Sequence, residues 1–231
     1  MRIRMKPPAD RTILSFFLAL AVTTAGGGIR ALARGEATMP ALDAHTVLQR
    51  MAARNPNLRS YEARVHVDVR MLSFPFFAPK LDGTTYFKRP DYFVVVFDRV
   101  PSYARGFQRI FDDVGNPQAW EKDQNVTLYG TTWLGARSVI VLRLTKKIHS
   151  DILDHTLAYV DPSDYSLLQM EWYYTNGGKI TMTQQYREQG GFSVLSQQHA
   201  TIKIPYVRAV ADSTYGTYET NVPIGNGGAS P

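Results

Sequence analysis

Apolar and polar residues alternate along much of this chain, and this alternation limits its possible folds more than any other feature. Between residues 61 and 71 every second side chain is apolar, and the side chains between them include Glu62 and His66. Successive side chains of a β-strand point to opposite faces, so a period of two predicts a strand with one apolar and one polar face. Strands of this kind are typical of antiparallel sheets with one face in the core.

The same pattern recurs in the second half of the chain, where turn residues separate the predicted strands. Residues 165–174, 179–186 and 200–206 carry apolar side chains at alternate positions. Asn176-Gly177-Gly178 predicts a hairpin, because Asn and Gly tolerate the positive φ that tight turns need. Residues 188–191 predict a second turn. We expect five further strands, at 83–88, 92–98, 125–130, 137–144 and 155–161.

One short helix is predicted before the strands, from about residue 43 to 54, with Asp43 as its N-cap and Asn55-Pro56 at its end. A helix of this length is unstable alone in water, so it must lie on another element. The aromatic spacing in 102–112 predicts a second helix. Nine or so strands joined mostly by hairpins must curl to cover their apolar face. The predicted fold is therefore mainly β, a curved antiparallel sheet with a helix across its mouth.

The first 33 residues have the pattern of a secretory signal peptide. Four basic residues precede the apolar run 13–22, and the small residues after it end in Ala31-Leu32-Ala33. Cleavage after Ala25 also fits. An uncleaved anchor is the alternative, although spanning a bilayer takes about 20 apolar residues. We therefore expect an exported, periplasmic protein with a signal peptide at 1–33, a single β domain at 34–222 and a flexible tail at 223–231.

The charge of the chain is concentrated in this predicted signal. The formal charge of +6 and the pI near 9.5 would fit a nucleic-acid-binding protein. Residues 1–33 hold five of the 26 Lys and Arg residues but one of the 20 Asp and Glu residues, so the remainder is nearly neutral. No nucleic-acid partner is predicted. The absence of cysteine excludes disulfides, thiolate metal ligands, a cysteine nucleophile and a lipid-bearing cysteine.

A motif at 83–93 connects the chain to a known fold. It reads Gly83-Thr84-Thr85-Tyr86-Phe87-Lys88-Arg89-Pro90-Asp91-Tyr92-Phe93, a strand that opens with Gly, ends in Lys-Arg-Pro and is followed by a second apolar strand. This segment resembles the outer-membrane lipoprotein carriers of the LolA/LolB-like superfamily, and the order of elements agrees from about residue 41 to 222. The resemblance implies an unclosed antiparallel β-barrel with a helical lid, whose interior takes the acyl chains of a lipoprotein or lipid.

The resemblance also implies a role for Arg89, because the matching arginine of the carriers hydrogen-bonds to the lid and helps to control its opening. A guanidinium at a cavity rim offers five donors to helix-end carbonyls or to a lipid head group. The alternative is a solvated strand end before Pro90. The chain departs from the carriers where Val100-Pro101 replaces their Asp-Gly turn, so their usual receptors are not implied.

We predict that the apolar strand faces line a cavity for acyl chains, where each buried methylene contributes about 0.8 kcal/mol. No catalytic role and no cofactor are predicted, because the common nucleophile, metalloprotease, phosphate-loop and dinucleotide motifs do not occur. The predicted ligand-binding residues are Val65, Val67, Val69, Phe87, Arg89, Leu168, Met170, Trp172, Ile180, Met182, Ile202 and Ile204.

Two segments leave alternatives open. Residues 149–155 hold two His and two Asp, which could bind a metal, but a polar loop is the simpler interpretation and no metal site is predicted. Residues 74–79, Phe-Pro-Phe-Phe-Ala-Pro, cannot form a core strand because proline breaks the pairing. They form either an exposed loop, able to touch a membrane or gate the cavity, or one buried under a neighbour. In a second hypothesis the sheet is packed solid and the loops 74–79 and 101–120 bind an envelope protein, as in a sensor or scaffold.

Overall fold

The computed structural model describes residues 42–90, 92–99, 114, 117–148 and 150–224. The predicted signal peptide and the predicted helix at 102–112 lie outside the described residues, as does most of the predicted tail. In the part of the chain that is described, no helix combines the length and the apolarity needed to cross a bilayer.

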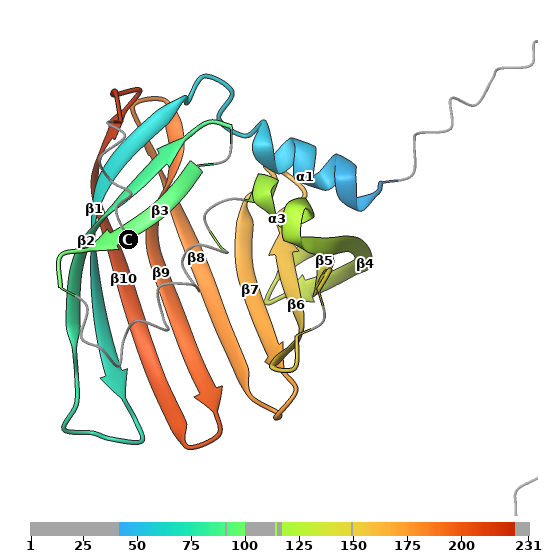
Figure 1. The fold of residues 1–231 in the computed structure, drawn as a ribbon. Coiled ribbons are helices and arrows are strands. Elements are labelled where there is room, and N and C mark those ends of the chain that lie inside the picture. Colours follow the sequence, from blue (N-terminus) through green and yellow to red (C-terminus); the bar gives the residue numbers. More distant parts are fainter. Residues whose placement is uncertain (1–41, 91, 100–113, 115–116, 149, 225–231) are drawn as a thin grey trace, which may run out of the picture. The chain divides into compact units, whose positions relative to one another are not determined.

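Ten antiparallel strands form one curved sheet (Figure 1). Their order is β3-β2-β1-β10-β9-β8-β7-β6-β5-β4, so β3 and β4 are the two edges and the sheet does not close into a barrel. The strands are β1 (Ser60–Met71), β2 (Lys80–Lys88), β3 (Tyr92–Phe97), β4 (Gln124–Leu134), β5 (Arg137–Lys146), β6 (Leu153–Val160), β7 (Leu167–Tyr174), β8 (Lys179–Gln189), β9 (Phe192–Ile204) and β10 (Val207–Thr220).

The pairing of β1 with β10 is the one contact between neighbouring strands that are far apart in the chain. The register runs from Tyr61 opposite Thr220 to Met71 opposite Ala209, with an irregularity between Ala63 and Val65. All other neighbours in the sheet are consecutive strands. The β1–β10 ladder therefore joins two meanders, β1–β3 and β4–β10, into one sheet.

The sequence pattern predicted nine or so strands, and of the ten among the described residues it did not reveal β10. The predicted strand at 200–206 is the second half of β9, which begins at Phe192. The chain then turns at Pro205 and Tyr206, and Tyr206 has a φ of 66°. In β10 the core-facing side chains include the small Ala209 and Ala211, so the alternation of this strand carries a weak hydrophobic signal.

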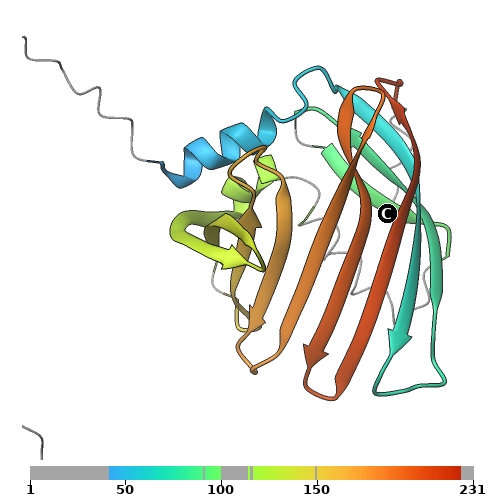
Figure 2. The same cartoon turned by 180° about the vertical axis from the view of Figure 1, so that it is seen from behind.

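Two short helices lie close together at one end of the sheet (Figure 2). The first, α1 (Ala44–Ala52), begins as predicted, since the Asp43 carboxylate accepts a 2.6 Å hydrogen bond from the Thr46 N–H. The second, α3 (Pro117–Asp123), leads directly into β4. The buried residues of α1 are Val47, Leu48 and Met51. They join the main core, so the sheet supplies the support that this helix lacks on its own.

The core lies along the apolar face of the sheet. One continuous row of cross-strand neighbours crosses seven strands, from β5 to β1, and large and small side chains share it. In this arrangement the bulk of one side chain occupies the space above a smaller neighbour. The row consists of Leu142, Ala158, Met170, Met182, Ala200, Ala211 and Val69.

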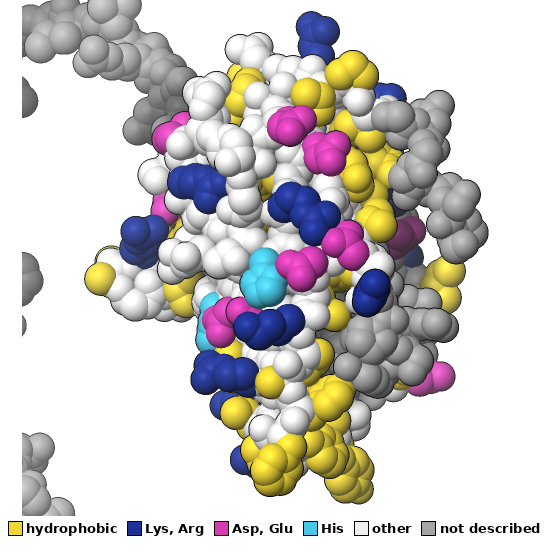
Figure 3. Space-filling model, turned by 90° about the vertical axis from the view of Figure 1, so that its left-hand side faces the viewer, with side chains coloured by type: hydrophobic (Ala, Val, Ile, Leu, Met, Phe, Trp, Pro, Cys, Tyr) yellow, Lys and Arg dark blue, Asp and Glu magenta, His cyan; other side chains and the backbone are white. Residues whose placement is uncertain are grey.

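Charged groups link neighbouring strands on the opposite face (Figure 3). His66 on β1 lies 2.8 Å from a carboxylate oxygen of Asp82 and 3.3 Å from one of Asp68. Lys80 contacts Asp68 at 3.4 Å. The hydrogen bond to Asp82, together with the charges of both carboxylates, outweighs the opposing effect of burial and raises the pKa of His66 above its ordinary value.

The raised pKa of His66 predicts a pH-dependent contribution to stability. A group whose pKa is higher in the folded state stabilises it below the unfolded pKa, near 6.5, and this contribution disappears as pH rises through the folded value. We expect His66→Asn to lower the free energy of unfolding at pH 5.5 and to change it little at pH 8.5, as measured by urea denaturation. An equal loss at both pH values would contradict this.

Gly83 on β2 is predicted to resist substitution because β3 lies against it. A Cβ atom at this position would approach the Val96 carbonyl oxygen to 2.6 Å and the Phe97 Cα to 3.0 Å, and both are backbone atoms. We expect Gly83→Ala to destabilise the protein by about 1–3 kcal/mol in chemical denaturation. The matched control is Gly216→Ala, where the nearest atom, the Arg64 Cβ, lies at an ordinary 3.5 Å.

Candidate functional site

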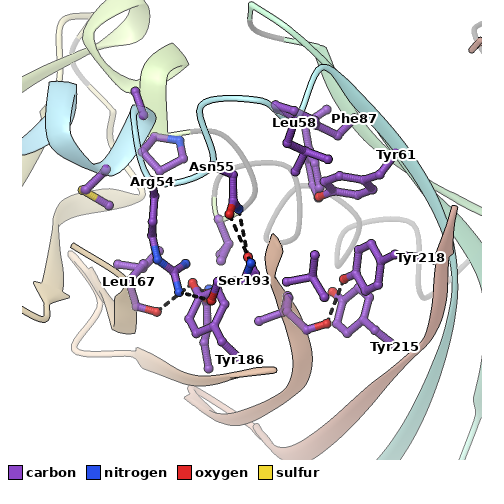
Figure 4. Close-up of a pocket in the computed structure, with 18 of the residues that line it drawn as sticks. Arg54, Asn55, Leu58, Tyr61, Phe87, Leu167, Tyr186, Ser193, Tyr215 and Tyr218 are labelled. Carbon is purple, nitrogen blue, oxygen red and sulfur yellow. Dashed lines mark hydrogen bonds between the residues drawn. The ribbon is translucent and has the colours of Figure 1, made fainter. Parts of the chain in front are cut away.

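A pocket lies between the end of α1 and the apolar face of the sheet (Figure 4). Its volume is about 160 Å³. The chain that follows α1 closes one side with Asn55 and Leu58, and side chains of β1, β2, β7, β8, β9 and β10 supply the opposite wall. The pocket is thus built from residues that are far apart in the sequence.

Aromatic rings form much of the wall. Tyr61 stacks on Phe87 with a centroid separation of 5.1 Å and meets Tyr218 edge-on at 5.0 Å. Tyr215 lies 6.4 Å from Tyr218 along the same strand. These separations are in the range of favourable ring contacts, which add to the stabilisation from apolar burial. The rings come from three adjacent strands, β2, β1 and β10, so the β1–β10 pairing assembles this wall.

The hydroxyl groups of these tyrosines bond to the protein. Tyr215 donates to the Gln198 side-chain oxygen at 2.7 Å, and Tyr218 donates to the Leu195 carbonyl at 2.8 Å. Burial raises the pKa of Tyr186 to about 12, and it also raises the pKa values of Tyr215 and Tyr218. The phenols therefore stay neutral at physiological pH, and the wall carries no negative charge from them.

Arg89 joins the sheet to residues 44–58, which comprise α1 and the chain that follows it and which we call the lid. Its Nε donates to the Leu58 carbonyl at 2.7 Å, and its Nη2 donates to the carbonyls of Asn55 at 2.8 Å and Ala52 at 3.1 Å. Ala52 is the last residue of α1, whose terminal carbonyls have no partner within the helix. One planar guanidinium thus supplies donors to three carbonyls at the end of α1 and in the chain that follows it.

Three more polar side chains hold the same segment to the other side of the pocket. The Arg54 guanidinium donates to Ser193 Oγ at 2.7 Å and to Asp164 at 3.2 Å, and it lies 4.1 Å above the Tyr186 ring. The Asn55 side chain exchanges hydrogen bonds of 2.9 and 3.1 Å with the backbone of Ser193. Arg50, one turn earlier, donates to the Tyr165 hydroxyl. The lid is therefore attached by polar contacts as well as by the buried α1 side chains Val47, Leu48 and Met51.

Among the residues that the structure describes, two buried polar atoms at the pocket have no hydrogen-bond partner. They are the side-chain amide nitrogen of Gln184 and the Nε of Arg54, and both residues line the pocket. A buried donor without a partner costs free energy. A ligand oxygen at this point would relieve that cost.

Solved structures share this architecture. A LolA superfamily protein from Nitrosomonas europaea is 14% identical and superimposes with a TM-score of 0.60, over 79% of this chain and 96% of its own. The fold is LolA-like. A DUF1329 family protein from Desulfovibrio piger has a TM-score of 0.61 at 10% identity, over 79% of this chain and 94% of its own.

A third solved structure with the LolA-like fold is a putative outer membrane lipoprotein-sorting protein domain from Vibrio parahaemolyticus. It is 11% identical and has a TM-score of 0.58, over 78% of this chain and 93% of its own. No family profile matches the sequence, and no curated protein matches it either. The fold predicted from residues 83–93 is confirmed by structure rather than by sequence similarity.

The structure separates the predicted ligand-binding residues into groups. Phe87 and Arg89 line the pocket. Val69 and Ile204 are half-buried at the margin of the core. The remaining members of the apolar face are buried in the core and do not line this pocket: Val65, Val67, Met170, Trp172, Ile180, Met182 and Ile202.

Leu168 is displaced from its predicted place by an irregularity in β7. Val160 of β6 pairs with Leu167 and Tyr159 pairs with Gln169, so Leu168 has no partner on β6. The residue that lines the pocket is Leu167, which is buried, whereas Leu168 is half-buried. A strict period of two cannot foresee such an extra residue.

Sequence reasoning did not predict several residues of the pocket. Tyr61 lies within the predicted alternation but is not among the predicted ligand-binding residues. Arg54 lies at the predicted end of the helix and is not among them either. Tyr215 and Tyr218 are three residues apart, so a period of two assigns them to opposite faces. The register of β10 on β1 shifts between Ala63 and Val65, and both rings thereby reach the pocket.

The segment that suggested metal binding is only partly described. His149 lies outside the described residues. His155 lies on β6, 2.6 Å from Asp154, and its ring stacks on Tyr173 at 4.6 Å. Over 42–90, 92–99, 117–148 and 150–224, no three His, Asp or Glu side chains are grouped as a metal site requires.

Arg89 is predicted to control the attachment of the lid. We expect Arg89→Leu to increase amide hydrogen exchange at residues 44–58 by at least tenfold, because three carbonyls lose a charged donor. Arg89→Lys keeps the charge but not the planar fork and should restore the protection only in part. Unchanged exchange at 44–58 in Arg89→Leu would contradict this role.

Proposed function

We propose that this protein is an exported, periplasmic carrier that shelters acyl chains of a lipid or lipoprotein and makes or breaks no covalent bond. The observation that carries the proposal is the contrast between the wall and the lid of the pocket. The wall is aromatic and continuous with the apolar face of the sheet. The lid is attached by hydrogen bonds of Arg89, Arg54 and Asn55. Polar contacts can exchange with water, so the main cost of opening is exposure of the buried α1 side chains, and an acyl chain in the opened pocket would cover that surface.

The size of the pocket implies that the lid must move for a chain to enter. A dry cavity of roughly 150 Å³ accommodates a benzene-sized molecule, and this pocket measures about 160 Å³. A long acyl chain therefore requires displacement of α1 and the chain after it. Once the lid is displaced, the apolar side chains of the sheet become available, at about 0.8 kcal/mol for each methylene buried.

The unpartnered donors of Arg54 and Gln184 support a polar group at one end of the ligand. Both residues lie at the β8 side of the pocket, close to Tyr186. An ester, amide or carboxylate oxygen is the acceptor that an acyl ligand offers there. The basic N-terminus and apolar run of residues 1–33 support export. The lipoprotein-sorting description of the structure from Vibrio parahaemolyticus agrees with the proposed class of ligand.

A second candidate function is a sensor or scaffold that binds an envelope protein. The observation in its favour is the close packing of the apolar face, since most of the side chains predicted to contact a ligand are already buried. Its test is a crosslinked pulldown from the envelope with wild type and a Phe76→Ser, Phe77→Ser variant. A specific protein partner, together with a failure to bind lipid, would favour this second function.

The carrier proposal predicts that filling the pocket removes the ligand. Leu195 on β9 lines the pocket and is half-buried. We expect Leu195→Trp to lower the fraction of lipid-bound protein at least fivefold in native mass spectrometry of protein purified from an envelope extract. The matched control is Leu128→Trp on β4, an exposed position outside the pocket, which should retain the wild-type fraction.

Added lipid provides a second measurement. Palmitate or a diacylated lipopeptide should raise the Tm of the wild type and of Leu128→Trp, but not that of Leu195→Trp. If only apo wild-type protein is found and neither compound raises its Tm, the carrier proposal is wrong.

A further inference from the structure

Exposed apolar side chains gather at the end of the sheet where three hairpins turn. We define the hairpin end as residues 70–80, 174–180 and 203–208, which connect β1 to β2, β7 to β8 and β9 to β10. Phe76 is fully exposed, and Tyr206 is 94% exposed. Leu72 and Phe74 each expose more than half of their surface. The lower end of the molecule in Figure 3 shows this concentration of hydrophobic surface.

The two apolar turns are held side by side. The Leu72 N–H donates to the Arg208 carbonyl at 2.7 Å, and the Arg208 N–H donates to Ser73 Oγ at 2.8 Å. Within the 72–79 loop, the Phe77 N–H donates to the Phe74 carbonyl at 2.9 Å. Phe74, Phe76 and Tyr206 are therefore presented together on an ordered surface.

The three segments of the hairpin end carry only cations, although three of these pair with acidic side chains just outside the segments and the adjoining loop, which accepts from Thr175, adds Asp151. Across residues 70–80, 174–180 and 203–208 there are five Lys or Arg residues and no Asp or Glu. This contrasts with the near neutrality of the chain after residue 33. The five cations are Arg70, Lys80, Lys179, Lys203 and Arg208.

Three of these cations are direct cross-strand neighbours. Lys203 on β9 lies opposite Lys179 on β8 and opposite Arg208 on β10. Like charges in this arrangement destabilise a sheet. Lys179 is partly compensated by Glu171 at 2.8 Å, whereas Lys203 and Arg208 have no ion-pair partner among the described residues. An external anionic surface would relieve this repulsion.

We propose that the hairpin end docks on the surface of an anionic phospholipid bilayer. Aromatic side chains enter the interface between head groups and acyl chains, and the surrounding Lys and Arg attract the negative lipids. The two cations beside the apolar turns that have no ion-pair partner among the described residues, Lys203 and Arg208, favour a bilayer as partner, because anionic lipids supply negative charge next to an apolar interior. This inference stands on residues outside the pocket and holds whether or not the pocket carries a lipid.

The fold sets the orientation of the docked protein. β1 begins near the end of α1 and reaches the 72–79 loop after 12 residues, a distance of roughly 40 Å for an extended strand. Arg89, which bonds to the lid, follows the far end of β2. Docking by the hairpin end therefore keeps α1 and the pocket away from the bilayer surface, accessible to a molecule on the other side.

The test is co-sedimentation of the purified protein with vesicles of phosphatidylcholine alone or with 30% phosphatidylglycerol. All variants share one N-terminus, so differences between them report on the hairpin end. We expect the wild type to bind the anionic vesicles at least tenfold more tightly than the neutral ones. Two double variants should each reduce binding to anionic vesicles at least tenfold. One combines Phe74→Ser with Phe76→Ser, and the other combines Lys203→Glu with Arg208→Glu.

Matched controls exclude general effects of hydrophobicity, charge and folding. Trp133→Ser removes another exposed aromatic residue, from β4. The double variant Arg59→Glu with Arg137→Glu changes the net charge as much as Lys203→Glu with Arg208→Glu does, but away from the hairpin end. Both should bind like the wild type, and all variants should keep the wild-type circular dichroism spectrum. The proposal is wrong if neither vesicle binds, if binding ignores phosphatidylglycerol, or if the hairpin-end variants bind as the controls do.

Discussion

The antiparallel pairing of β1 with β10 is the interaction on which the rest of the structure depends. It joins two local meanders into one ten-stranded sheet with a continuous apolar face. It also brings Tyr61 beside Tyr218 and so completes the aromatic wall of the pocket. Without this pair, β1 to β3 would form a three-stranded unit with little apolar surface to bury.

The pocket combines two kinds of interaction that differ in how readily they can be reversed. The rings and aliphatic side chains of the wall are packed within the sheet, and separating them would expose apolar surface to water. The segment from α1 to Leu58 is attached through hydrogen bonds of Arg89, Arg54 and Asn55, which water can replace, and through the buried apolar side chains of α1. In the proposed carrier, an acyl chain would cover the apolar surface that the α1 side chains leave when the lid opens.

The two ends of the long strands differ in chemistry. One end holds the lid and the pocket, and the other holds apolar turns flanked by five cations, of which Lys203 and Arg208 have no ion-pair partner among the described residues. Strands of 12 to 14 residues, such as β1 and β10, keep the two ends well apart. In the proposed arrangement, the protein can therefore contact a bilayer with one end while its pocket exchanges a ligand at the other.

The sequence by itself determined the local elements: alternation gave most of the strands, Asp43 gave the start of α1, and the motif around Arg89 led to the LolA-like fold. These signals are short-range, because side-chain periodicity and capping depend on neighbouring residues. The tertiary structure decided which side chains meet. The irregularities in β7 and in the β1–β10 pair placed Leu167, Tyr215 and Tyr218 in the pocket, and strand pairing brought Lys203 and Arg208 together at the hairpin end. Register between distant strands depends on packing of the whole core, which no local pattern contains.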